Sequence, residues 1–199
     1  NVRFLAAGHD LSFGSGGRGN AALLRKLAPE LGFTVETIDK ICLDGEEVCS
    51  TLVRRYVEAG NLEAVEKLLG EPYLVAGKVV RGNQIGRTLG FPTVNIEPPP
   101  SKLLPPCGVY FSRVRHRGKL YRAITNVGYK PTVTDRHSMG VESYLYDFQE
   151  EIYGEEIEVY LCSFRRPERQ FASVEALRQQ LQAYIAAGSV NCSPILKEL

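Results

Sequence analysis

The chain has 199 residues, of which 44% are hydrophobic and 24% charged, enough for one large or two small domains with buried cores. Its 24 lysines and arginines nearly balance 23 acids, so no overall field favours nucleic acid or a membrane surface as a partner. No apolar run approaches the ~20 residues that a membrane helix needs.

The first residues and the cysteines describe the setting of the chain. It starts at Asn1, in a segment patterned like the middle of a strand and without a secretory signal, so we expect it to begin inside a larger protein. The five cysteines are widely scattered, unlike the close pairs of a zinc site or the dense set of a disulfide scaffold. Together these features predict a cytoplasmic protein.

The first seventy residues alternate between strand and helix patterns. Asn20 is placed to cap a helix that Gly32 ends, although Pro29 weakens its last turn and leaves an earlier end open. Asn61 is placed to cap a later helix that Gly70 ends. Strands are expected over 2–7 and 33–38, and helices over 20–31, 50–57 and 61–69. This order is typical of a piece of an open α/β domain.

From residue 73 the pattern changes to short strands separated by glycine and proline turns. Residues 116–119 predict a hairpin turn. Ser173 is placed to cap a final helix, whose apolar stripe is Val174, Leu177, Leu181 and Ile185. Strands are expected over 73–80, 109–115, 120–127, 141–148 and 156–163. The sequence therefore predicts an α+β chain, with an α/β piece over 1–70 and an antiparallel barrel or sandwich over 71–199.

The segment 82–95 carries the most chemistry. Its three glycines let backbone N–H groups approach a phosphate closely, and Arg87 adds a positive charge. Thr93 and Asn95 then present two oxygen donors on one side of an extended segment, which suits Mg²⁺ shared with phosphate and water. The alternative is a glycine-rich turn that leads into an ordinary strand. Spacing alone favours that alternative, because the segment matches neither a P-loop nor a dinucleotide fingerprint.

Five segments from residue 86 onward resemble, in order, the motifs of one family. The segments, with the family patterns, are 86–95 (G-R-T-L-G-F-P-T-V-N against G-R-x-L-G-F-P-T-A-N), 106–110 (P-C-G-V-Y against P-x-G-V-Y), 126–132 (N-V-G-Y-K-P-T against N-I-G-x-x-P-T), 141–148 (V-E-S-Y-L-Y-D-F against V-E-x-x-L-L-D-F, followed by Tyr153-Gly154) and 166–171 (R-P-E-R-Q-F against R-x-E-x-x-F). The family is that of the riboflavin kinases. The departures are Arg81 where the family often has His, Val94 for Ala and Tyr146 for Leu.

Two upstream segments resemble the FAD synthetase domain that precedes the kinase in bifunctional bacterial proteins. Residues 8–14 are similar to its G-x-D-F-x-F-G, and residues 48–54 to its I-S-S-T-x-I-R. Ser50, Thr51 and the helix start could hold an anion there. The H-x-G-H motif of nucleotidyl transfer does not occur in these residues. We therefore expect a partial nucleotidyltransferase domain and no FMN adenylyltransferase activity from this chain alone.

The resemblance implies a Greek-key-like antiparallel β-barrel with a C-terminal helix, which transfers the γ-phosphate of ATP to the 5′-hydroxyl of riboflavin and gives FMN. It assigns the general base to Glu142. In a strand, Glu142 shares a face with Tyr144 and Tyr146, although strand position alone favours a solvated glutamate on a half-exposed strand. The residues implied for ATP and phosphate are Gly86, Arg87, Gly90, Thr93 and Asn95, with Mg²⁺ on Thr93 and Asn95; those implied for the flavin or a flap are Asn126, Gly128, Thr132, Arg166 and Glu168.

Alternatives remain for these residues and for the function. Asn126, Gly128 and Thr132 could equally form a strand end and turn. For Arg166 and Glu168, a surface ion pair is the commoner outcome. The chain could be a non-catalytic flavin- or nucleotide-binding regulatory barrel, or an FAD synthetase whose other half lies elsewhere. The expected partners are ATP, riboflavin and FMN, without nucleic acid or membrane.

Overall fold

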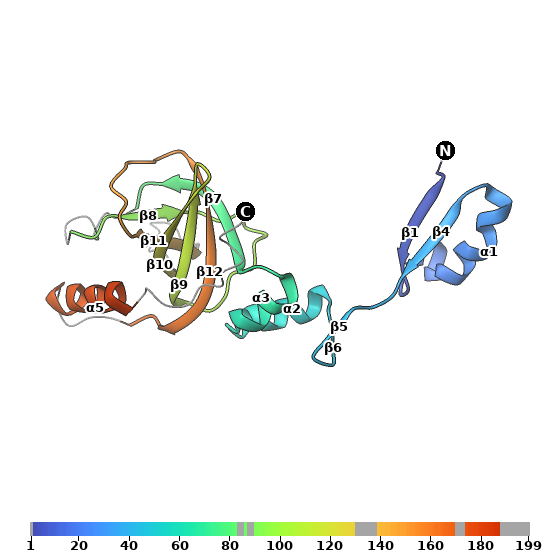
Figure 1. Cartoon of the computed structure of the whole chain (residues 1–199), viewed down its shortest axis with the longest axis horizontal. Coiled ribbons are helices and arrows are strands. Elements are labelled where there is room, and N and C mark those ends of the chain that lie inside the picture. Colours follow the sequence, from blue (N-terminus) through green and yellow to red (C-terminus); the bar gives the residue numbers. More distant parts are fainter. Residues whose placement is uncertain (1, 83–85, 87–89, 130–138, 170–173, 188–199) are drawn as a thin grey trace. The chain divides into compact units, whose positions relative to one another are not determined.

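The computed structural model describes residues 2–82, 86, 90–129, 139–169 and 174–187 (Figure 1). The chain forms two compact units, Asn1–Cys49 and Ser50–Leu199. The unit with the barrel thus begins earlier than the predicted domain boundary near residue 70. The division into domains 1–70 and 71–199 stays a prediction.

The first unit contains a strand–helix–strand element, as its pattern predicted. Strand β1 (Phe4–Gly8) pairs in parallel with β4 (Thr34–Ile38), and α1 (Ala21–Leu31) connects them. The Asn20 side chain accepts the N–H of Leu23 at 2.9 Å, and Gly32, with φ of 72°, ends the helix. The helix contains Pro29 and still runs to Leu31. Four short strands and a 3₁₀ turn were not predicted: β2 (Ser12–Phe13), η1 (Ser15–Gly17), β3 (Gly19–Asn20), β5 (Cys42–Leu43) and β6 (Glu46–Glu47).

Two short helices open the second unit and pack on its barrel. Helix α2 covers Ser50–Glu58, and α3 covers Leu62–Leu69, with its start capped by the Asn61 side chain on the N–H of Ala64. Leu62 and Val65 are 2% and 0% exposed and belong to the same core cluster as the barrel residues. The apolar faces of these helices therefore complete the core of the barrel unit.

Six antiparallel strands form a closed barrel in the order β7-β8-β11-β10-β9-β12, which confirms the predicted barrel (Figure 1). The strands are β7 (Tyr73–Val80), β8 (Thr93–Ile96), β9 (Gly108–His116), β10 (Lys119–Tyr129), β11 (Met139–Leu145) and β12 (Glu156–Pro167). Arg117 and Gly118 join β9 to β10 with φ of 48° and 77°, as a two-residue hairpin turn requires. Strand β8 was not among the predicted strands. Strand β11 ends before the predicted residue 148, because Asp147 turns the chain with φ of 55°.

Helix α5 (Val174–Ala187) follows the barrel as predicted. The predicted cap Ser173 lies outside the described residues, as do the side chains of Val174, Leu177, Leu181 and Ile185. Among the described helices, none has the length and apolar character to cross a membrane.

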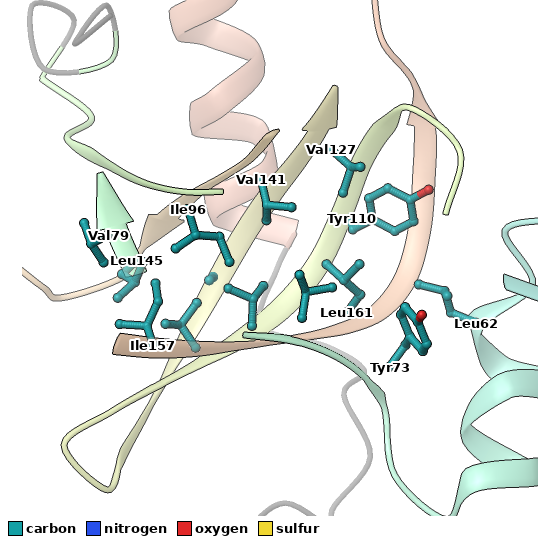
Figure 2. Close-up of a cluster of buried hydrophobic side chains, with 14 of the residues drawn as sticks. Leu62, Tyr73, Val79, Ile96, Tyr110, Val127, Val141, Leu145, Ile157 and Leu161 are labelled. Atoms are coloured by element: carbon teal, nitrogen blue, oxygen red, sulfur yellow. The ribbon is translucent and has the colours of Figure 1, made fainter. Parts of the chain in front are cut away.

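The barrel core is built from alternating side chains of all six strands (Figure 2). Leu161 on β12 is 0% exposed within this core, whereas Leu69 at the end of α3 is 46% exposed. We expect Leu161→Ala to lower the free energy of unfolding by about 2–5 kcal/mol, since it removes buried apolar atoms and leaves a cavity. Leu69→Ala, the matched control, is expected to change it by about 0.5 kcal/mol. Urea denaturation followed by circular dichroism measures both; equal losses would contradict this assignment of the core.

Candidate active site

The outer face of two neighbouring strands, β8 and β11, brings together the predicted Thr93, Asn95 and Glu142, which we call the oxygen-rich row. In the register of β8 and β11, Glu142 lies opposite Asn95, and Tyr144 lies opposite Thr93. The Thr93 hydroxyl donates a hydrogen bond to a carboxylate oxygen of Glu142 at 2.5 Å. On β11 the intervening Val141, Ser143 and Leu145 are buried, so Glu142 and Tyr144 share the outer face as predicted.

The glycines before β8 have packing reasons that the structure makes visible. A Cβ at Gly82 would lie 2.6 Å from the side-chain nitrogen of Asn95, which is itself 8% exposed. A Cβ at Gly86 would lie 2.5 Å from the Phe91 carbonyl oxygen, whereas the Phe91 N–H donates to the Gly86 carbonyl at 2.8 Å. Gly90 has φ of 81°. Gly82 and Gly86 are therefore required by the close approach of Asn95 and Phe91, and Gly90 by its positive φ. Arg87 lies outside the described residues.

Of the predicted flavin or flap residues, Asn126 and Gly128 lie on β10, next to β11, whereas Arg166 and Glu168 lie at the end of β12. Asn126 on β10 lies opposite Glu142, and its amide donates to a carboxylate oxygen of Glu168 at 2.8 Å. A Cβ at Gly128 would lie 1.9 Å from that carboxylate, so only glycine leaves room for it. Arg166 donates from Nε to the Tyr184 hydroxyl of α5 and from Nη1 to the Pro167 carbonyl at 2.7 Å. Thr132 lies outside the described residues.

An apolar aromatic face continues from this row across β9, β10 and α5. The Tyr146 hydroxyl donates to the Tyr184 carbonyl at 3.0 Å, and the Tyr144 and Tyr146 rings meet edge to face at 5.6 Å. Burial raises the pKa of Tyr146 to about 12, and burial, with Asp147 adding to it, raises the pKa of Tyr144, so both hydroxyls stay protonated at neutral pH. The members of this face are Val109, Phe111, Ile124, Tyr144, Tyr146 and Tyr184. Val109, Phe111, Ile124 and Tyr146 are buried, so this face is a second apolar cluster, and only Tyr144 and Tyr184 are partly exposed at its edge.

The sequence contained a signal for this face that the prediction did not use. Strand β9 has an unbroken run of large apolar residues, Val109-Tyr110-Phe111, and these are buried on both sides of the strand. A strand with only one face on a core alternates between apolar and polar residues. The apolar run therefore marked a second buried surface.

A cavity of about 310 Å³ is lined in part by Thr93 and Asn95. Residues 92–95 form one part of its lining, residues 148–153 form another, which we call the wall, and Val79 and Gly82 complete it. Its volume lies at the lower end of the range of small-molecule sites. The wall 148–153 was not predicted as part of the site, although its residues follow the motif around Glu142.

The donors of this site fit a hard divalent cation. Thr93 offers a hydroxyl, Asn95 an amide oxygen and Glu142 a carboxylate on adjacent strands. Among the described residues, no group of three or more His, Cys, Asp or Glu side chains could hold a metal. Mg²⁺ fits the oxygen donors of Thr93, Asn95 and Glu142, because it usually takes one or two protein ligands and completes its shell with phosphate and water.

The closed barrel thus carries three oxygen donors beside a cavity of the size of a small-molecule site. The family model for riboflavin kinase matches residues 69–189, and that for FAD synthetase matches residues 1–52. The chain belongs to the riboflavin kinase family, with a segment of an FAD synthetase at its start.

Known relatives agree with this assignment. The chain is 38% identical over 183 residues to a bifunctional riboflavin kinase/FMN adenylyltransferase of Haemophilus influenzae, covering 92% of this chain and 59% of that protein. A Listeria monocytogenes protein of the same description is 39% identical, with 92% and 58% covered. A crystal structure described as a macrolide-efflux protein from Streptococcus pneumoniae superposes with a TM-score of 0.84 at 33% identity, covering 96% of this chain and 60% of that one. The chain spans about three fifths of the length of these curated relatives.

Proposed function

We propose that this chain is an ATP:riboflavin 5′-phosphotransferase that makes FMN and ADP. The observation that carries the proposal is the Thr93–Glu142 hydrogen bond with Asn95 opposite, placed between a cavity and an aromatic face. Phosphoryl transfer needs alignment of two substrates and neutralisation of charge more than covalent chemistry by the protein. Two binding surfaces that meet at one oxygen-rich row satisfy that need.

Glu142 acts as the general base in this proposal. The 5′-oxygen of riboflavin attacks the γ-phosphorus of ATP, the bond from that phosphorus to the bridging oxygen of ADP breaks, and the hydroxyl proton passes to the Glu142 carboxylate. Tyr144 is partly exposed and shares the outer face of β11 with Glu142, so a flavin ring that contacts Tyr144 would bring its hydroxyl chain close to the carboxylate. Thr93 orients the carboxylate by its hydrogen bond.

The cavity side takes the nucleotide. Thr93 and Asn95 would hold Mg²⁺, which would supply charge neutralisation at the phosphates when bound. Gly86, Gly90 and Arg87 are proposed to face the phosphates, where backbone N–H groups and a guanidinium complement negative charge.

The flavin side depends on the residues around the row. Asn126 and Glu168 are linked by a hydrogen bond, and Gly128 leaves room for the Glu168 carboxylate, which supports a role of these residues beside the flavin. Arg166 would hold helix α5 on the same side through Tyr184. Thr132 is proposed for the flap over the substrates on the family motif alone.

The parent protein is proposed to carry FMN adenylyltransferase as well, with residues 1–70 as part of that domain and residues 71–199 as the kinase. We expect no adenylyl transfer from this chain alone, because it lacks the H-x-G-H motif. The proposed setting is the cytoplasm, with small molecules as partners and neither nucleic acid nor membrane.

Incubation with riboflavin, ATP and Mg²⁺, followed by chromatography of the flavins, tests this function. We expect FMN alone, and no product when Mg²⁺ is omitted. Bound flavin or nucleotide without any FMN would instead support the non-catalytic barrel. FAD as a product would contradict the expectation for the first unit.

A further inference from the structure

One buried histidine contacts Phe148, at the start of the cavity wall 148–153, and Glu155, two residues beyond its end; the wall with these two residues is the segment 148–155. The His116 ring packs edge to face against Phe148, with centroids 5.8 Å apart, and its Nε2 hydrogen-bonds the Glu155 carboxylate at 2.7 Å. Between these two contacts the chain follows the wall, where Gln149, Glu150 and Glu151 are exposed. His116 is 3% exposed and lies at the end of β9, away from the oxygen-rich row.

Further contacts fix the end of the wall. Arg117 donates to both oxygens of Glu155, at 2.6 and 3.0 Å. The backbone of the same turn bonds to β7, since the Val79 N–H donates to the Glu155 carbonyl and the Gly154 N–H to the Val79 carbonyl, both at 2.8 Å. Ile152, which is 2% exposed, anchors the middle of the wall in the core. The hydrogen bond with His116, and then Arg117, lowers the pKa of the Glu155 carboxyl, which keeps it ionised.

The wall serves the cavity and not the aromatic face. Val79, Phe148 and Ile152 line the cavity with Thr93 and Asn95, whereas the aromatic face is built from β9, β10, β11 and α5. A shift of the wall would therefore change the nucleotide side of the site and leave the flavin side in place.

We propose that His116 and Glu155 are positioning residues for the nucleotide: by fixing both ends of the segment 148–155, they keep the cavity wall 148–153 in place beside Thr93 and Asn95. The proposal rests on the proposed function for the identity of the ligand, and it extends that function to residues of the β9–β10 hairpin. Neither side chain lines the cavity itself, so both act through the wall.

The test is ATP affinity in the full chain, measured by calorimetric titration of MgATP without riboflavin. We expect His116→Ala and Glu155→Ala each to raise the Kd for ATP roughly tenfold, because small displacements of a binding wall have effects of this size. In the FMN assay, KM for ATP should rise likewise, with KM for riboflavin and kcat at saturating ATP within about twofold. Hydrogen exchange should become faster in residues 149–154.

Two further variants separate positioning from general loss of stability. Glu155→Gln keeps one acceptor oxygen, which can serve His116 and Arg117 Nε, but loses the acceptor for Arg117 Nη2, so it should recover part of the affinity. Glu156→Ala removes an exposed glutamate one residue away and should bind ATP as the unchanged chain does. If His116→Ala does not fold, Glu155→Ala and Arg117→Ala, both on surface-accessible side chains, carry the test.

Unchanged ATP affinity in the alanine variants, or equal weakening for ATP and riboflavin, would overturn the positioning role. FMN formation by the unchanged chain is a separate result that tests the proposed function. The ATP titration and hydrogen exchange therefore decide this inference even if no FMN forms.

Discussion

Replacing Glu142 by glutamine should lower kcat for FMN formation by roughly 10²–10⁴-fold, the usual cost of losing a positioned general base. The glutamine amide has nearly the size of the carboxylate, and its oxygen can still accept the hydrogen bond from Thr93. It cannot accept a proton at neutral pH. The geometry of the row should therefore persist while the proton acceptor is lost, so that ATP affinity changes by no more than about twofold.

Single-turnover kinetics with saturating MgATP and riboflavin, together with titration of ATP, measures the two quantities separately. Glu156→Gln is the matched control, since it makes the same chemical change at an exposed position of β12 and should leave kcat unchanged. If Glu142→Gln turns over as fast as the control, Glu142 is not the base. A fall in ATP affinity as large as the fall in kcat would make Glu142 a binding residue.

Local signals predicted the elements of this fold well. The caps Asn20 and Asn61 and the terminators Gly32 and Gly70 mark the helix ends that the structure has. These signals act within one turn of chain, so a sequence displays them directly. The hairpin at Arg117-Gly118 is of the same kind.

Non-local contacts explain what the sequence did not predict. Strand β8 has four residues, and its pairing with β7 and β11 defines it more than its own pattern does. The attachment of α3 to the barrel depends on Leu62 and Val65 meeting a core assembled from distant strands. Such contacts need three-dimensional closure, which periodicity within a segment cannot express.

In the site, too, local patterns predicted residues but not their arrangement. The family motif predicted Thr93, Asn95 and Glu142, but their proximity follows from the register of β8 on β11, across a long separation in sequence. The cavity wall and its contacts with His116 could not be predicted from the sequence for a further reason. These contacts link the β9–β10 hairpin, the segment 148–155 and strand β7, which share no local sequence pattern.

Replacing Asn95 by alanine should weaken MgATP binding by roughly 10–100-fold, because removal of groups that support a metal site has effects of this size. Asn95 is 8% exposed, faces Glu142 across the strands and lines the cavity, so its amide oxygen is placed to bind a cation shared with the phosphates. Alanine keeps the strand and removes that oxygen. The measurement is ATP affinity with Mg²⁺ and with EDTA, and the thermal midpoint shows whether the barrel stays folded.

A comparison between the two conditions decides what Asn95 does. Because the proposed contribution passes through Mg²⁺, the difference between Asn95→Ala and the unchanged chain should nearly vanish in EDTA. Thr93→Val, which keeps the shape of threonine and removes its hydroxyl, should behave in the same way on the neighbouring position of β8. If ATP binding weakens equally with and without Mg²⁺, Asn95 acts through packing and not through the cation. Its amide packs against Gly82, at the place where a Cβ of that residue would lie.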